Sequence, residues 1–308
     1  MDIDPSDAKA PYYLGCLLFE HQLGRAVSLF EKSKELDPSF YIVHRNLGLA
    51  CEKSEKDYKK ALSYMMDAVK CNSKDYRLMF EVDRLNHLAG LTADEKYKFC
   101  KKYFNTFSLH DESLLKMVTR MVENRKYDEA LNILENHVIV ESENATEKQI
   151  DFITSYCLRA WDQLAKGKSS AALKTMQKAL DYPMGRYARA QYAQMYWFAG
   201  TAAERCGDTS LAAQYFAQGV DIKGNAAEIR ELPELKYGFY IGKCYEKIGE
   251  NEKAKAVFEA LGNPPAELDC ANAEYEKGLA ALGLGDNASA KEHLQKAYSL
   301  DNRLIFAK

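Results

Sequence analysis

The feature that most constrains this chain is an internal repeat towards its C-terminus. A set of five small or apolar residues recurs three times with identical internal spacing. The three sets are Gly200, Gly207, Ala212, Phe216 and Gly219; Gly242, Gly249, Ala254, Phe258 and Leu261; and Gly278, Gly285, Ala290, Leu294 and Ala297. Self-similarity at a fixed period is the signature of a repeat architecture, so the fold of the whole chain follows from its repeating unit.

The third residue of each set is an alanine, and a residue at the corresponding position can be followed through the earlier units towards the N-terminus. We call these residues the column. The column reads Ala26, Ala61, Glu95, Ala130, Ala172, Ala212, Ala254 and Ala290, with steps of 35, 34, 35, 42, 40, 42 and 36 residues. Each unit shows a 3.6-residue apolar period, a break at glycine or a polar residue, and a second such period. This pattern predicts two antiparallel helices joined by a tight turn.

The residue types at fixed positions of the unit have a physical reason. Glycine at the break suits a first helix that ends in the left-handed conformation, and a small residue in the second helix lets the two axes approach closely. No stretch alternates apolar and polar residues as a strand would. The sequence therefore predicts an all-α fold, with looser packing in the third unit, where Glu95 replaces alanine.

The repeat resembles the tetratricopeptide repeat. The resemblance rests on the period near 34 residues, the Leu-Gly pairs at Gly15 and Gly48, the Ala-x-x-x-Phe steps and Pro38. It implies a single domain over 1–308, a right-handed superhelical solenoid (α-α superhelix) of about eight helix-turn-helix repeats. The approximate repeats are 8–38, 39–73, 74–108, 109–146, 147–184, 185–225, 232–266 and 270–302.

A narrower resemblance concerns the segments APYYLG, RNLGLA and ALDYP. They are similar to the C-terminal helical-repeat part of large bacterial proteins that carry a preceding domain of unknown function. Residues 1–10 also match the closing segment of a repeat. We therefore expect the chain to start within a solenoid, as part of a larger protein.

Charge and composition exclude several classes of protein. The 42 Lys and Arg residues nearly balance the 45 Asp and Glu residues, whereas a nucleic-acid binder usually has a basic excess. The sequence contains no run of 18 or more apolar residues, so it predicts no membrane span. The N-terminus lacks the features of a secretory signal. The eight cysteines show no paired spacing, which favours reduced thiols and a cytoplasmic location.

The sequence offers no convincing set of catalytic groups. Its glycines stand singly at helix breaks rather than in a phosphate-binding loop, and its six histidines have no partner at i+4 for metal binding. We therefore predict neither catalysis nor a cofactor nor a metal. The predicted function is a non-catalytic scaffold that binds a protein or peptide, without nucleic-acid or membrane partners.

The resemblance implies where such a partner binds, because the first helix of each tetratricopeptide unit lines the concave face. The candidate peptide-binding residues on this face are Trp161, Gln194, Trp197, Thr201, Lys236, Phe239, Lys243, Asn272 and Tyr275. The aromatic row suits an extended or helical peptide with apolar anchors. Alternatively, these rings fill the inside of a tight superhelical turn.

Two further features leave alternatives open. The first helix presents Tyr12, Tyr13 and Leu17 without a preceding helix, which predicts contact with another copy in a homodimer or with a missing N-terminal domain. The longer steps predict loops at 141–149, 181–188 and 221–234 that either carry specificity or act as spacers. The alternative functions are the non-catalytic helical-repeat portion of a larger bacterial enzyme, either carbohydrate-active or of another class, and an architectural self-association module.

Overall fold

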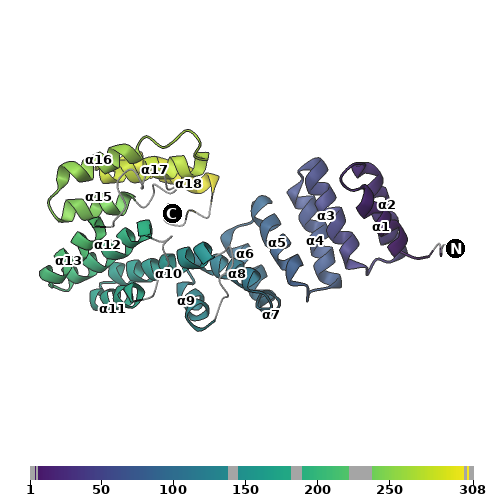
Figure 1. Cartoon of the computed structure of the whole chain (residues 1–308), viewed down its shortest axis with the longest axis horizontal. Coiled ribbons are helices and arrows are strands. Elements are labelled where there is room, and N and C mark those ends of the chain that lie inside the picture. Colours follow the sequence, from purple (N-terminus) through teal and green to yellow (C-terminus); the bar gives the residue numbers. More distant parts are fainter. Residues whose placement is uncertain are drawn as a thin grey trace. The chain divides into compact units, whose positions relative to one another are not determined.

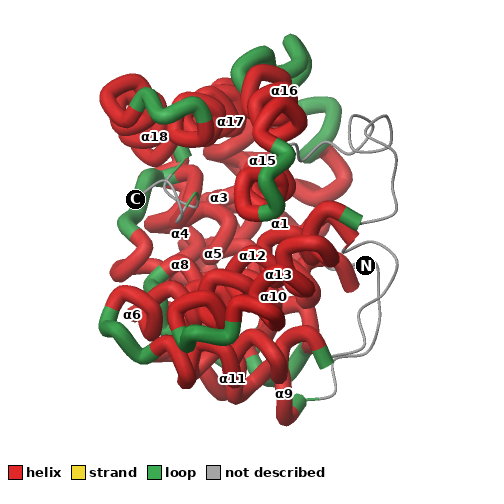
Figure 2. The backbone as a smooth tube through the Cα atoms, turned by 90° about the vertical axis from the view of Figure 1, so that its left-hand side faces the viewer, coloured by secondary structure: helices red, strands yellow, loops and turns green. Residues whose placement is uncertain are grey.

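The computed structural model describes residue 4, residues 6–137, 145–181, 189–221 and 238–301, and residue 304. Over these residues the chain forms 17 helices and no strand (Figure 2). The prediction of an all-α helical repeat fold is therefore confirmed. The chain divides into two compact units, Met1–Arg120 and Met121–Lys308, which are described separately.

The first unit is a series of helix pairs followed by single helices. Its helices are α1 (Lys9–Leu18), α2 (Leu23–Leu36), α3 (Tyr41–Glu55), α4 (Tyr58–Cys71), α5 (Tyr76–Leu88), α6 (Ala93–Lys102), the short α7 (Phe104–Phe107) and α8 (Asp111–Glu123), which passes the boundary residue Arg120. In Figure 1, α1 lies beside α2 and α3 beside α4. Each of these two pairs is one helix-turn-helix unit.

The second unit repeats the same pairing. Its helices are α9 (Tyr127–Asn136), α10 (Ala145–Ala165), α11 (Ser169–Leu180), α12 (Arg189–Arg205), α13 (Thr209–Val220), α15 (Gly238–Lys247), α16 (Asn251–Leu261), α17 (Cys270–Gly283) and α18 (Asn287–Leu300). Helices α10 and α11, α12 and α13, α15 and α16, and α17 and α18 pack against each other. The division of the chain into eight repeats stays a prediction.

The tight turns within the pairs follow from their sequence. Gly207 and Gly285 have φ angles of +84° and +83°, and in each case the next residue is an aspartate that caps the second helix. The Asp208 carboxylate accepts a hydrogen bond from the Leu211 N–H at 2.9 Å, which satisfies one unpaired donor of the first turn. The predicted left-handed end of the first helix is thus confirmed at these glycines.

The column of small residues lies in the core. Its alanines, namely Ala26, Ala61, Ala130, Ala172, Ala212, Ala254 and Ala290, are at most 3% exposed. Glu95 does not share this buried position, because it is exposed and forms a capping box with Thr92 at the start of α6. The looser packing predicted for this unit stays a prediction. The next residue, Lys96, is buried instead, so this unit is shifted by one residue.

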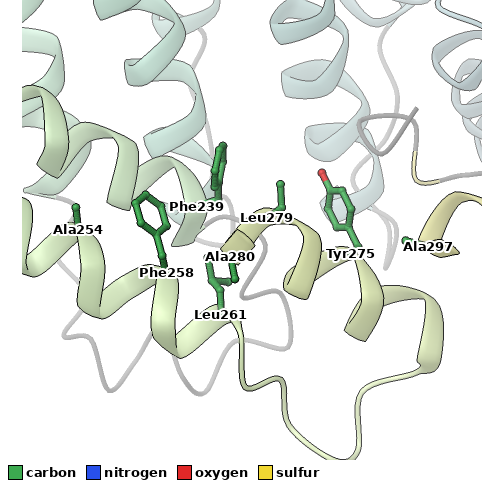
Figure 3. Packing of buried hydrophobic residues seen from close by; sticks show 8 residues of the cluster. All are labelled: Phe239, Ala254, Phe258, Leu261, Tyr275, Leu279, Ala280 and Ala297. Atoms are coloured by element: carbon green, nitrogen blue, oxygen red, sulfur yellow. The ribbon is translucent and has the colours of Figure 1, made fainter. Parts of the chain in front are cut away.

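The core of the second unit continues to its C-terminal pairs. One cluster joins residues from α15 to α18, and Figure 3 shows its rings and aliphatic side chains packed between these helices. Most of the residues of the three expected long loops lie outside the described part of the chain, namely 141–144, 182–188 and 222–234. Within the part that the structure describes, no helix is long and apolar enough to cross a membrane.

Candidate functional site

The second unit contains an aromatic pocket of about 530 Å³. Its lining residues are Trp161, Leu164 and Ala165 of α10; Trp197, Phe198, Thr201 and Arg205 of α12; Phe239, Tyr240 and Lys243 of α15; and Leu282 of α17. The volume falls in the range of sites that hold a small ligand or one or two side chains. The pocket is therefore a candidate binding site in this unit.

Helical spacing explains why these side chains meet. Trp197, Thr201 and Arg205 follow one another at intervals of four residues on α12, and Phe239 and Lys243 have the same interval on α15. Residues four apart lie on one face of a helix, one turn above the other. Each of these two helices thus turns one stripe of side chains towards the pocket.

The aromatic rings of the pocket hold one another in place. The Trp197 ring lies 4.9 Å from Phe198 at 78° and 5.6 Å from Tyr240, measured between ring centroids. The Trp161 ring lies 6.4 Å from Phe198. Phe198 is only 3% exposed, whereas Trp161 remains 42% exposed. Phe198 therefore forms a buried wall of the pocket, and Trp161 forms an exposed edge that is available for contact.

Two residues that line this pocket each carry a buried polar atom that has no hydrogen-bond partner among the described residues. These atoms are Nε1 of Trp197 and Oγ1 of Thr201, and Thr201 as a whole is 8% exposed. Most buried polar groups in native proteins are hydrogen-bonded, so such an atom needs an explanation. The two atoms lie on one face of α12, one helical turn apart.

The charged residues that line the pocket are both cationic. The Arg205 Nη1 atom donates a hydrogen bond to the Leu164 carbonyl at 3.0 Å. The Lys243 ammonium pairs with Glu246, one turn further along the same helix, and keeps 27% of its side chain exposed. The pocket thus combines an apolar interior with two positive side chains.

The structure brings together five of the residues that the sequence predicts for the concave face. Trp161, Trp197, Thr201, Phe239 and Lys243 all line the pocket. Phe239 belongs in addition to the core cluster of Figure 3 and is 7% exposed. The ring of Phe239 thus serves both the pocket wall and the core.

The remaining predicted residues lie elsewhere. Gln194 is buried, its Nε2 atom donates to the Tyr240 hydroxyl at 3.2 Å, and it does not line the pocket. Asn272 hydrogen-bonds Asp269 at the start of α17. Tyr275 lies in the core cluster, where burial raises the pKa of its hydroxyl, and it does not line the pocket. Lys236 lies outside the described residues.

Sequence reasoning missed several lining residues. Phe198 and Tyr240 directly follow Trp197 and Phe239, so a projection onto one helix face passes over them. Arg205 continues the four-residue step from Trp197 through Thr201 and could have been found in that way. Leu282 comes from a helix of the next pair, for which the sequence gives no such signal.

The predicted self-association residues differ in their exposure. Tyr12 packs in the core of the first unit, with its ring centroid 5.1 Å from that of Phe40, and burial raises its pKa to about 12. Tyr13 and Leu17, in contrast, are 61% and 77% exposed. Only these two of the three residues present an apolar surface on α1.

The buried thiols and the metal-ligating residue types offer no chemistry near the pocket. Burial raises the pKa of the Cys157 thiol, and it raises that of Cys244 to about 12, so both stay protonated and unreactive at neutral pH. Within the described ranges, no group of three or more His, Cys, Asp or Glu side chains could hold a metal ion.

Comparison with known families assigns parts of this unit. Two family models described as "Tetratricopeptide repeat" match the chain, one over residues 157–227 and one over residues 271–303. The first match includes Trp161 and the pocket-lining residues of α12. The candidate site therefore lies largely within a matched segment.

Among similar solved structures is a tetratricopeptide repeat protein from Parabacteroides merdae, at 13% identity, with 96% of this chain and 93% of that chain covered and a TM-score of 0.43. A second is the P58(IPK) tetratricopeptide domain, at 14% identity, with 98% of this chain and 96% of that chain covered and a TM-score of 0.33. A third is the TPR2AB domain of yeast Sti1 in its pHSP90 complex, at 15% identity, with 96% of this chain and 98% of that chain covered and a TM-score of 0.37. The two matched segments, together with the helix pairs described above, show that the chain contains tetratricopeptide repeats.

Proposed function

We propose that this chain is a non-catalytic scaffold whose aromatic pocket binds an apolar side chain of a protein or peptide partner. The observation that carries the proposal is the pocket between α10, α12 and α15, which is walled by aromatic rings and edged by the exposed Trp161. Large aromatic side chains around a desolvated pocket are typical of the few residues that dominate binding energy.

The mechanism is burial of an apolar side chain on a surface that is already organised. Helical backbone and ring-to-ring contacts fix Trp197, Phe198 and Tyr240 before a partner arrives, so little ordering entropy remains to be lost. Full burial of one Leu, Met or Phe side chain contributes about 1.5–3 kcal/mol. Further contacts of the partner with neighbouring helices would be needed for tight binding.

Catalysis is a weaker interpretation of the same residues. An acid-base mechanism needs a titratable group whose pKa suits proton transfer and that faces the substrate. The charged residues that line the pocket are Arg205 and Lys243, and none of its described lining residues carries a carboxyl, imidazole or thiol group. Their chemistry is that of recognition.

The test is selection of ligands from a random 16-residue peptide library displayed on phage, with the full chain as bait. Affinities of the selected peptides are then measured for the wild type, for Trp161→Ala and for Phe104→Ala. Phe104 is a matched control, because its side chain is also 42% exposed but lies in α7 of the first unit.

The proposal predicts that Trp161→Ala weakens binding at least tenfold, whereas Phe104→Ala leaves it unchanged. Thermal melting of both variants should match that of the wild type, since neither ring is buried. Peptides that bind both variants equally well, or a selection that yields none, would contradict the assignment of the pocket.

Self-association is a second candidate function, favoured by the exposure of Tyr13 and Leu17 on α1. Apolar side chains exposed next to each other often mark an interface. We expect light scattering to give a larger mass for the wild type than for the double variant Tyr13→Asp, Leu17→Asp, with unchanged helical signal. Equal monomeric masses for the two proteins would exclude this candidate.

A further inference from the structure

The exposed face of α1 is the face by which the next first helix, α3, packs against the preceding pair. The two helices align through Gly15 and Gly48, because each glycine lies against a large side chain of its own second helix. Three residues of α1 then have counterparts in α3: Tyr13 corresponds to Asn46, Leu14 to Leu47 and Leu17 to Ala50. The exposed fractions are 61%, 46% and 77% in α1 but only 8%, 2% and 1% in α3.

The preceding pair covers this face of α3. Leu47 packs in one core cluster with Ala26 and Phe30 of α2, and the Nδ2 atom of Asn46 donates to Cys16 Sγ of α1 at 3.4 Å. The corresponding residues of α1, namely Tyr13, Leu14 and Leu17, carry no charge, and we call them the α1 face. Each repeat buries its apolar side against a neighbouring repeat, so the surface that fits the α1 face is another helix pair of the same kind.

The last second helix, α18, exposes part of a surface that other second helices bury. The residue four positions after the column alanine is at most 3% exposed in five earlier pairs, as Phe30, Met65, Met176, Phe216 and Phe258. Its counterpart in α18, Leu294, is only partly buried, and so is Tyr298 one turn further along. We call Leu294 and Tyr298 the α18 face.

Contacts between neighbouring pairs of the second unit indicate how the two faces meet. A Cβ atom on Gly262, at the end of α16, would lie 3.6 Å from the Cβ atom of Ala280 in α17. Ala280 stands two residues after the packing glycine of its helix, as Leu17 does in α1. Gly262 stands eight residues after the column alanine of its pair, as Tyr298 does. Applied to two copies of the chain, this contact brings Leu17 of one copy against Tyr298 of the other.

We propose that copies of this chain assemble head to tail, with the α1 face of one copy packed on the α18 face of the next, as α3 packs on α2 within one copy. The occupant of each face is a second copy, because the two faces are the two halves of one repeating contact and both occur in the same chain. This inference rests on the self-association proposed above and identifies the surface of the partner copy. The contact is heterologous, since it joins two different surfaces.

Variants that each lack one face test this arrangement. Leu17→Asp places a charge on the α1 face and Tyr298→Asp places one on the α18 face, where burial of an unpaired charge is costly. Masses are measured by sedimentation velocity of the full chain over about a hundredfold range of concentration, because association depends on concentration.

Two exposed leucines outside the faces provide matched controls. Leu109→Asp and Leu300→Asp change side chains that are 64% and 53% exposed. Leu300 lies on α18 itself, but its counterpart in α2, Leu36, stays 37% exposed although a further pair follows it. Leu300 is therefore not part of the stacking surface, and both controls should associate as the wild type does.

We expect the mass of the wild type to rise with concentration, and each face variant to raise the dissociation constant at least about tenfold. An equal mixture of the two face variants should form pairs of copies and nothing larger. Only one intact contact remains in this mixture, between the α1 face of Tyr298→Asp and the α18 face of Leu17→Asp. In a symmetric contact between two α1 faces, by contrast, Tyr298→Asp alone would associate as the wild type does.

Photo-cross-linking supplies a second measurement that leaves the partly buried Tyr298 unchanged. Leu17 is replaced by the photoreactive residue p-benzoylphenylalanine in isotope-labelled chains, which are mixed with unlabelled wild-type chains so that cross-links between copies are recognised by mass. The expected cross-links join position 17 to α18 of the unlabelled copy.

The outcomes separate this inference from self-association in general. A wild type that keeps the mass of one copy at every concentration would overturn both. Association with cross-links from position 17 to α1 of the other copy would overturn the head-to-tail contact and leave self-association intact. A mixture of the two face variants that contains no pairs, although each variant melts as the wild type does, would also overturn the head-to-tail contact.

Discussion

Gly200 of α12 lies directly against the ring of Phe216 in α13, so that a Cβ atom on Gly200 would come within 2.5 Å of Phe216 Cε1. The same relationship joins the two helices of four other pairs. The pairs of residues are Gly15 and Phe30, Gly48 and Met65, Gly242 and Phe258, and Gly278 and Leu294. A glycine in the first helix thus makes room for a large side chain of the second, which explains why both recur in the sequence.

Gly200→Ala should therefore destabilise the protein by about 1–3 kcal/mol, since the added methyl group overpacks a closed contact. The measurement is urea unfolding followed by the helical circular dichroism signal. Gly24→Ala in α2 is the control, because nothing lies within 4 Å of the added Cβ, and it should be neutral or slightly stabilising. Equal stability of the two variants would contradict the packing role of Gly200.

Substitutions at two turns of the helix pairs should change stability in opposite directions. Lys56 ends α3 with a φ of +51°, a conformation that costs a residue with a side chain about 1–2 kcal/mol and that glycine adopts freely. Lys56→Gly should stabilise the protein by up to about 1 kcal/mol, and Gly207→Ala, at a φ of +84°, should destabilise it by a similar amount. Differential scanning calorimetry that shows both changes with the same sign would contradict this explanation.

A buried ion pair stabilises the first unit. Both guanidinium contacts of Arg120 to the Asp83 carboxylate measure 2.8 Å, and the two side chains are 7% and 3% exposed. Asp83→Ala should cost about 3–5 kcal/mol of unfolding free energy, because it removes one half of a buried, hydrogen-bonded ion pair. The measurement is chemical denaturation of the full chain.

Two further variants test the reason for this loss. Adding Arg120→Met to Asp83→Ala should recover part of the stability, because the buried cation is then removed together with the buried anion. Lys70→Ala breaks an exposed pair with Asp67 and should cost no more than about 1 kcal/mol. If the double variant is less stable than Asp83→Ala alone, loss of packing rather than an unpaired charge explains the effect.

The carboxyl group of Glu274 should make the stability of the last helix pair depend on pH. A hydrogen bond from His293 at 2.7 Å, with help from Lys296 at 3.2 Å, lowers the pKa of its carboxyl to about 2 from an ordinary value of 4.5. A depressed carboxyl pKa stabilises the folded state above the unfolded pKa, and this stabilisation is lost as the pH falls through the folded pKa. It should thus be complete above pH 4.5 and disappear between pH 4.5 and 2.

The measurement compares unfolding free energies of the wild type and Glu274→Gln across this range. We expect the wild type to be more stable at pH 6 and the difference to shrink below pH 4.5. Glu259→Gln is the control, since its exposed carboxylate lies 3.8 Å from the nearest lysine. A difference that stays constant down to pH 3 would show that the loss is one of packing.

The sequence predicts the helix pairs well because their determinants are local. Gly207 with Asp208 defines a turn, and the column of alanines marks the buried face of each second helix. The departure from the buried column at Glu95 has a local cause as well. Thr92 and Glu95 form a capping box, which moves the start of α6 and places Lys96 in the core. Repeat spacing alone cannot detect such a shift of one residue.

The pocket was only partly predictable because its walls come from separate helix pairs. Trp161, Trp197 and Phe239 follow from the register of each first helix, whereas the distances between those helices depend on packing. Packing also places Tyr275 in the core, although its register resembles that of Phe239. The sequence pattern thus identifies a helix face, and tertiary contacts decide which part of it stays accessible.

The most direct test of the account uses the two tryptophans of the chain, which both line the pocket. Nitrogen-15 spectra of the full chain should contain two indole N–H signals, one each for Trp161 and Trp197. Titration with a peptide selected as above should shift both signals, because both indole rings line the pocket. A peptide that binds the wild type with both indole signals unchanged would contradict binding in this pocket.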